Sequence, residues 1–84
     1  MKSTEQVMPV IKKIYEEKLH KNQNEIIKLI IDKNHNYIVL KDDWKTTILR
    51  KDIDDYFDPQ KETKQKRAAE LKIIHALENF EKID

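Results

Sequence analysis

The stretch NYIVLKDDWKTTILRKDIDDYF, residues 36–57, indicates the fold more clearly than any other part of the chain. It contains two runs suited to strands, YIVL at 37–40 and WKTTIL at 44–49, because β-branched and aromatic side chains favour extended backbone. Asp42 and Asp43 lie between the runs and suit a tight turn. This part of the sequence therefore predicts a β-hairpin.

The segment before the hairpin, residues 25–33, can be interpreted in two ways. As a strand, IIKLII pairs with the hairpin and completes a three-stranded meander; as a helix, it makes a winged helix-turn-helix. Its isoleucine content favours the strand. We expect one α+β domain over residues 1–84. Its N-terminal helix precedes a small antiparallel sheet (a hairpin or a three-stranded meander) and a long C-terminal helix, and the winged helix-turn-helix is the alternative.

Apolar residues at helical spacing predict the helices. The first runs from about Gln6 to His20, with Pro9 near its start, where proline is tolerated. A short helix over Asp52–Phe57 follows the hairpin, with Asp52 as its N-cap.

The last helix is predicted from about Pro59 to Lys82, with Asp58 as its N-cap. At 1.5 Å per residue it would be ~35 Å long, more than a small domain can cover. Its apolar stripe runs from Ala69 to Ile83, so we expect two copies of the chain to pair through this helix.

Composition excludes several classes of protein. The chain has 84 residues, a net charge of +1, and neither cysteine nor glycine. Disulfide scaffolds, thiolate metal sites and glycine-rich phosphate loops are therefore absent. The three histidines lack ligand spacing, and we expect no metal, no cofactor and no enzymatic activity. Without an apolar run of membrane-spanning length or a secretory signal, we expect a cytoplasmic protein with no membrane partner. The Lys, Ile, Asn and Asp bias suits an AT-rich genome such as that of a phage or mobile element.

Basic side chains gather in two places and predict nucleic-acid binding through phosphate contacts. The start of the last helix also offers free N–H groups to an anion. The residues expected to bind DNA or RNA are Lys61, Lys64, Lys66 and Arg67 at that helix, with Lys45 and Arg50 on the hairpin.

Two segments resemble nucleic-acid-binding families. KQKRAAELKIIHAL, residues 64–77, is loosely similar to the last helix of double-stranded-RNA-binding domains, which share the order helix, three strands, helix. That family's glycines are missing, and residues 53–60 would be an insertion. The hairpin at 37–57 is similar to the wing of winged-helix excisionases. Asp42 and Asp43 at its tip would repel phosphate, in departure from that pattern.

A protein partner is the alternative. Trp44 follows a polar turn and can act as an aromatic anchor, while Asp54 and Asp55 can face a basic groove. The sequence thus predicts stoichiometric binding of one of two kinds. The chain is either an accessory or regulatory factor on nucleic acid, or an inhibitor that docks on a host nucleic-acid-handling or defence complex, such as a CRISPR effector.

Overall fold

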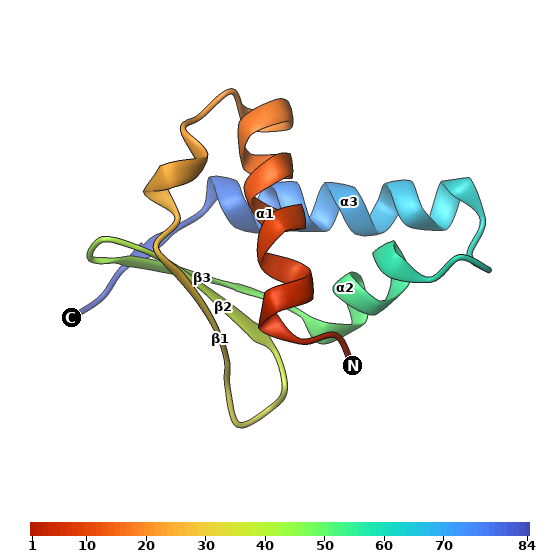
Figure 1. Cartoon of the computed structure of the whole chain (residues 1–84), viewed down its shortest axis with the longest axis horizontal. Coiled ribbons are helices and arrows are strands. Elements are labelled where there is room, and N and C mark those ends of the chain that lie inside the picture. Colours follow the sequence, from red (N-terminus) through yellow and green to blue (C-terminus); the bar gives the residue numbers. More distant parts are fainter.

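The computed structural model describes all residues from Met1 to Asp84 and confirms the α+β prediction. Four antiparallel strands form one sheet in the order β1-β2-β3-β4, and the helices lie together beside it (Figure 1). The elements in chain order are α1 (Thr4–Leu19), a 3-10 turn (Gln23–Glu25), β1 (Lys28–Ile31), β2 (Tyr37–Lys41), β3 (Trp44–Ile48), α2 (Arg50–Phe57), α3 (Thr63–Glu78) and β4 (Glu81–Lys82).

The ambiguous segment is a strand. Residues 28–31 pair with β2 in a register that places Leu29 opposite Val39. The three-stranded meander is therefore correct, and the winged helix-turn-helix alternative is wrong. Side chains of β1 alternate between a covered and an open face of the sheet, which a helical segment would not do.

Polar residues make the turns that glycine makes in other proteins. Asp42 adopts φ 51° in the two-residue turn between β2 and β3, and His35 adopts φ 65° between β1 and β2. The Asp32 side chain holds the latter turn by accepting hydrogen bonds from the backbone N–H groups of Asn34 (2.8 Å) and Asn36 (3.0 Å). Asn and Asp tolerate this backbone and bond to it locally.

Both long helices pack on one face of the sheet. That face presents Leu29, Val39 and Thr46 as neighbours across three strands, and all three are buried. The neighbouring residues in each strand, among them Ile30 and Ile38, point to the opposite face of the sheet, which no helix covers. The core comprises Val7, Ile11, Ile14, Tyr15, Ile26, Leu29, Tyr37, Val39, Ile48, Ile53, Ile73 and Leu77.

The first two helices begin earlier than predicted. In α1, Ser3 is the N-cap, and the Ser3 and Gln6 side chains bond reciprocally to each other's backbone N–H groups. Pro9 thus lies inside the helix. In α2, Leu49 occupies the N-cap position, whereas Asp52 is buried in the first turn with its carboxylate 3.9 Å from the Lys72 ammonium.

The prediction of a single helix over 59–82 is wrong at both ends. Asp58 accepts a hydrogen bond from the Gln60 backbone and makes a turn instead of a cap. At the other end, Asn79 donates from its side chain to the His75 carbonyl, and the chain then extends into β4. The 16 residues of α3 span ~24 Å, not ~35 Å. The excess length that led us to expect pairing through this helix is therefore absent.

None of the helices combines the length and the apolar character needed to cross a membrane.

Candidate functional site

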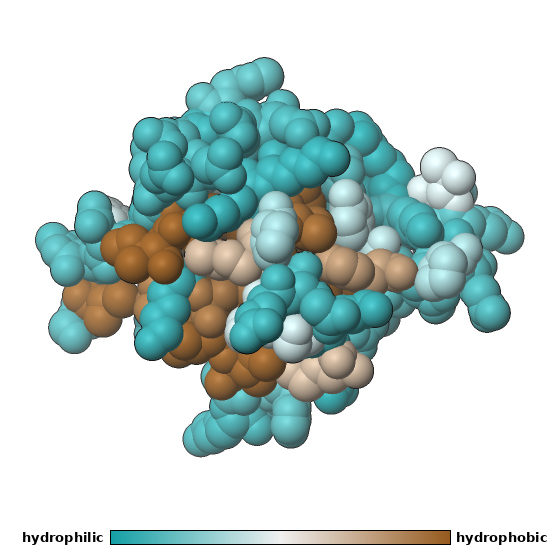
Figure 2. Space-filling view, in the orientation of Figure 1, coloured by the Kyte–Doolittle hydropathy of each residue, from teal (hydrophilic) through white to brown (hydrophobic).

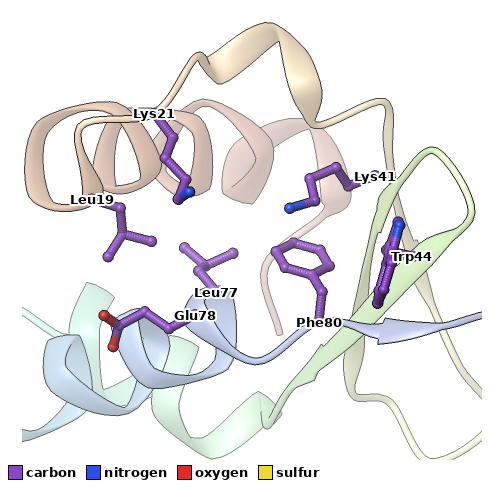
Figure 3. A pocket seen from close by; sticks show the side chains of 7 residues that line it. All are labelled: Leu19, Lys21, Lys41, Trp44, Leu77, Glu78 and Phe80. Atoms are coloured by element: carbon purple, nitrogen blue, oxygen red, sulfur yellow. The ribbon is translucent and has the colours of Figure 1, made fainter.

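A cleft of about 440 Å³ opens where the ends of α1 and α3 meet the β2–β3 hairpin (Figure 3). Aliphatic, aromatic and charged side chains from α1, β2, β3, α3 and two connecting segments line it. These are Leu19, Lys21, Lys41, Trp44, Leu77, Glu78 and Phe80. We call it the Trp44 cleft.

Trp44 stands at one side of this cleft because of its position in β3. It is the first residue of the strand and pairs with Lys82 of β4. Strand alternation gives it the same face as Thr46 and Ile48, which the helices cover. Trp44 lies beyond the reach of that cover, so 41% of its surface is exposed. Large aromatic side chains in such settings are common anchors of protein interfaces.

Lys41 is held in place beside Trp44, its cross-strand partner in the hairpin. Its ammonium lies 4.4 Å from the Phe80 ring centroid and 3.4 Å from the Tyr15 hydroxyl oxygen. Cations are attracted to aromatic faces, and partial desolvation strengthens this attraction. The Tyr15 and Phe80 rings also pack edge to face, with centroids 6.4 Å apart, so the lysine lies over two rings that contact each other.

Tyr15 links this lysine to an acid. Its hydroxyl donates to the Glu25 carboxylate over 2.6 Å. Burial, together with the hydrogen bond to Glu25 and its charge, raises the pKa of the Tyr15 phenol well above its ordinary value. The phenol therefore stays protonated at neutral pH and keeps donating to Glu25.

The cleft thus combines an apolar floor with two ammonium groups. Lys21 approaches from the loop after α1, and Lys41 from the end of β2 (Figure 3). Glu78 adds a carboxylate from the last residue of α3. An apolar side chain could insert between Trp44 and Phe80, and a neighbouring carboxylate could pair with a lysine.

Asp54 and Asp55 do not share a surface with Trp44, contrary to the prediction. Asp55 is near the start of α3, where its carboxylate lies 3.8 Å from the ammonium of Lys61. The Trp44 cleft is lined by Leu77 and Glu78 at the other end of α3. The strand β3 separates Trp44 from α2 because it runs from the cleft toward the helix. The predicted docking face is therefore reduced to Trp44.

The six residues predicted to bind nucleic acid also lie in different parts of the structure. Lys45 pairs with Glu81 of β4 near the end of α3, whereas Lys64, Lys66 and Arg67 lie at its start. Arg50 begins α2. These positions form no single basic surface.

Acids occupy part of the basic cluster at the start of α3. Besides the Lys61–Asp55 pair, the Arg67 guanidinium lies 3.1 Å from Glu70. Glu62 stands at the N-cap position of the helix, where a phosphate would otherwise bind. Lys64 and Lys66 form no ion pair and remain the available cations of this cluster.

Sequence reasoning missed Phe80, Tyr15 and Lys41 as parts of a site. Phe80 falls within the apolar stripe of the predicted last helix, and Tyr15 falls within the predicted first helix, so neither position indicates a binding site. Asn79 was the signal for the end of α3, because asparagine competes with helical backbone for hydrogen bonds. Neither the contact of Lys41 with Phe80 nor that of Tyr15 with Glu25 has a local sequence signature.

No protein-family model matches the chain, and neither a curated protein nor a solved structure does. None of these comparisons supports the resemblance to double-stranded-RNA-binding domains that the sequence suggested. The helix α2 and the strand β4 are additions to the order helix, three strands, helix that those domains share.

Proposed function

We propose that the chain is a small non-enzymatic binding protein that docks stoichiometrically on a protein partner through the Trp44 cleft. The observation that carries the proposal is the half-exposed Trp44 beside a hollow of about 440 Å³ with a preformed lysine–aromatic wall. The partner class predicted from the sequence, a host nucleic-acid-handling or defence complex, is kept as part of the proposal.

Charges around the cleft favour a protein over a polyanion. Glu78 lines the cleft, Asp42 and Asp43 form the adjacent turn, and Glu81 lies opposite Lys45. These carboxylates would repel the closely spaced phosphates of a nucleic acid. A protein partner that carries charges of both signs and an apolar anchor side chain could pair with the carboxylates and with the lysines around the cleft.

The preformed arrangement of the cleft wall supports docking. Lys41 is already positioned by Phe80 and Tyr15, so binding would not have to order this long side chain. Preorganised groups reduce the entropy lost on association. The arrangement suits a partner that presents an apolar side chain beside a carboxylate.

The first prediction concerns Trp44, the only tryptophan of the chain. Trp44→Ala should weaken partner binding by about 30-fold or more, the equivalent of ~2 kcal/mol for a hot-spot residue. Proteins captured from host lysate by the parent chain are identified, purified and titrated, and Trp44 emission should shift to the blue with a 1:1 endpoint.

Leu71→Ala is the matched control, because Leu71 is also half exposed, at 50%, but lies on α3 outside the cleft. It should bind like the parent. Equal binding by Trp44→Ala and the parent would refute docking through the cleft.

Nucleic-acid binding is the second candidate, and the unpaired Lys64 and Lys66 favour it. The second prediction is that Lys64, Lys66 and Arg67 carry any affinity for duplex DNA or RNA. Changing all three to alanine should lower the slope of log affinity against log salt by about 0.9 for each phosphate that the variant no longer neutralises. The measurement is an electrophoretic shift across a salt series.

Lys12, Lys13 and Lys18 of α1 provide the control for that experiment. Their triple alanine variant has the same change in net charge as the α3 variant but leaves the start of α3 intact. If both variants bind duplex equally well, the α3 cluster is not the binding site.

A further inference from the structure

The outer edge of the sheet at β1 is unusually apolar for a free strand. β1 stands at the end of the strand order, so it pairs on one side only. Ile27, Ile30 and Ile31 in and beside it are 59%, 37% and 38% exposed. Figure 2 shows hydrophobic side chains gathered over the part of the molecule where β1 lies in Figure 1. An edge strand presents unpaired N–H and C=O groups, and with exposed apolar side chains it can act as a template for pairing with another chain.

The ladder between β1 and β2 shows which backbone groups are free at this edge. Lys28 lies opposite Leu40 and Ile30 opposite Ile38, and Asp32 continues the ladder with a 3.0 Å bond from its N–H to the Asn36 carbonyl. Alternate residues of an antiparallel strand direct their N–H and C=O groups to opposite sides. Because Asp32 bonds inward, Ile30 and Lys28 do so too, and Leu29 and Ile31 direct theirs outward. The alternation ends at Lys28, because the Ile27 N–H also bonds inward, to the Leu40 carbonyl over 2.9 Å.

We propose that β1 pairs antiparallel with β1 of a second copy, with Ile30 opposite Ile30 of that copy, to form one continuous eight-stranded sheet. In this register Leu29 of each copy exchanges both backbone hydrogen bonds with Ile31 of the other. The helices of both copies stay on the same face, because paired residues share the parity of the strand.

Charge complementarity selects this register. It places Lys28 opposite Asp32 of the other copy, twice by symmetry. Lys28 forms no ion pair within its own chain, and one Asp32 oxygen, Oδ1, accepts both bonds of the turn, which leaves Oδ2 for a lysine. Moving the axis to Leu29 would set Lys28 opposite Ile30 and lose both pairs.

Apolar burial follows the same register. On the open face of the sheet, Ile38 and Ile30 of one copy continue into Ile30 and Ile38 of the other. On the covered face, Ile31 packs beside the Leu29 of the second copy. The pairing therefore buries Ile30 and Ile31 of the edge. It also provides hydrogen-bond partners for the free backbone N–H and C=O groups of Leu29 and Ile31.

The proposal is tested by the oligomeric state of the full chain. In sedimentation equilibrium, the mass should rise from 10.2 kDa toward twice that value as the concentration increases through the micromolar range. Ile30→Lys sets two like charges at the symmetry axis, and Lys28→Glu faces Asp32 with another acid. Each should raise the dimer dissociation constant by at least about tenfold, since like charges directly opposite destabilise a sheet.

Leu71→Lys is the matched control, an exposed apolar residue changed in the same way away from β1, and it should dimerise like the parent. A mass of 10.2 kDa at all concentrations overturns the proposal. A dimer unaffected by Ile30→Lys and Lys28→Glu also overturns it, because that dimer would use another surface.

Cysteine cross-linking tests the register itself, since the natural chain has no cysteine. Residues opposite each other in a non-hydrogen-bonded pair have Cα atoms about 4.5 Å apart, within disulfide range. Ile30→Cys should therefore form an interchain disulfide under mild oxidation. Lys28→Cys should not, because its symmetry mate is displaced by four residues, about 13 Å along the strand. Cross-linking of Lys28→Cys without Ile30→Cys overturns the register.

Discussion

Thr46 connects the sheet to α3 through one hydrogen bond. Its side chain is buried on the covered face of β3, and its hydroxyl donates to the Ala76 carbonyl over 2.7 Å. Thr47, the next residue, points to the open face and is exposed. Two neighbouring threonines of β3 thus experience opposite environments, as strand alternation requires.

The third prediction concerns Thr46→Val, which keeps the side-chain shape but removes the hydroxyl. The free energy of unfolding should fall by about 1 kcal/mol, a typical value for one hydrogen bond. In a domain of this size Tm should fall by roughly 4–8 °C. The measurement is thermal and urea unfolding followed by circular dichroism.

Thr47→Val serves as the control, because it is the same chemical change at a site with no such hydrogen bond. Its effect on unfolding free energy should stay within about 0.5 kcal/mol, as for other surface substitutions. A decrease as large as that of Thr46→Val would show that the Ala76 hydrogen bond is not the cause.

At the scale of elements, the sequence predicts the features that depend on interactions between residues close together in the chain. The hairpin turn was predictable because Asp42 tolerates positive φ, and β1 because its isoleucines suit a strand. The start of α1 was also present in the sequence: Ser3 and Gln6 have the spacing of a capping box. The predicted start at Gln6 was too late because Pro9 was expected to lie close to the start of the helix.

The path of the chain after α3 depends on tertiary contacts that no local pattern records. Phe80 continues the helical spacing of Ile73 and Leu77, so periodicity alone extends the helix to it. In the fold, Phe80 instead packs against Tyr15 and Lys41, and the following residues pair with β3. The Trp44 cleft exists because of this departure, which explains why only Trp44 among its residues was predicted.

For the whole molecule, the candidate surfaces are separated by the length of α3. The Trp44 cleft lies at the end of that helix and the Lys64–Lys66 cations at its start, while the β1 edge is a third region. One chain can therefore dimerise through β1 and still present a cleft in each copy. Docking of such a dimer on a partner with two sites would gain from effective concentration.

Two buried phenols, Tyr15 and Tyr37, and the partly buried phenol of Tyr56 link the stability of the fold to alkaline pH. Burial is the main cause that raises the pKa of Tyr15, Tyr37 and Tyr56, and nearby carboxylates raise all three further: Glu25 for Tyr15, Asp54 for Tyr37, and Glu70 and Glu17 for Tyr56. In the unfolded chain these phenols titrate near pH 10. Above that pH the unfolded state releases protons that the folded state retains, so the stabilising contribution is complete below pH 10 and is lost as pH rises further.

The last prediction is alkaline unfolding that coincides with tyrosine ionisation. The free energy of unfolding in urea should be insensitive to these phenols between pH 7 and 9. Above pH 10 it should decline by up to about 1.4 kcal/mol per pH unit for each phenol that ionises on unfolding. Absorbance at 295 nm should rise in the same cooperative step as the loss of circular dichroism.

Tyr15→Phe isolates one phenol. This variant loses the Glu25 hydrogen bond and some stability at pH 7, but the decline of its unfolding free energy above pH 10 should be shallower than that of the parent. A smooth rise in absorbance near pH 10 with the fold intact would show that the phenols ionise freely in the native protein, and an unchanged decline in Tyr15→Phe would show that Tyr15 does not contribute.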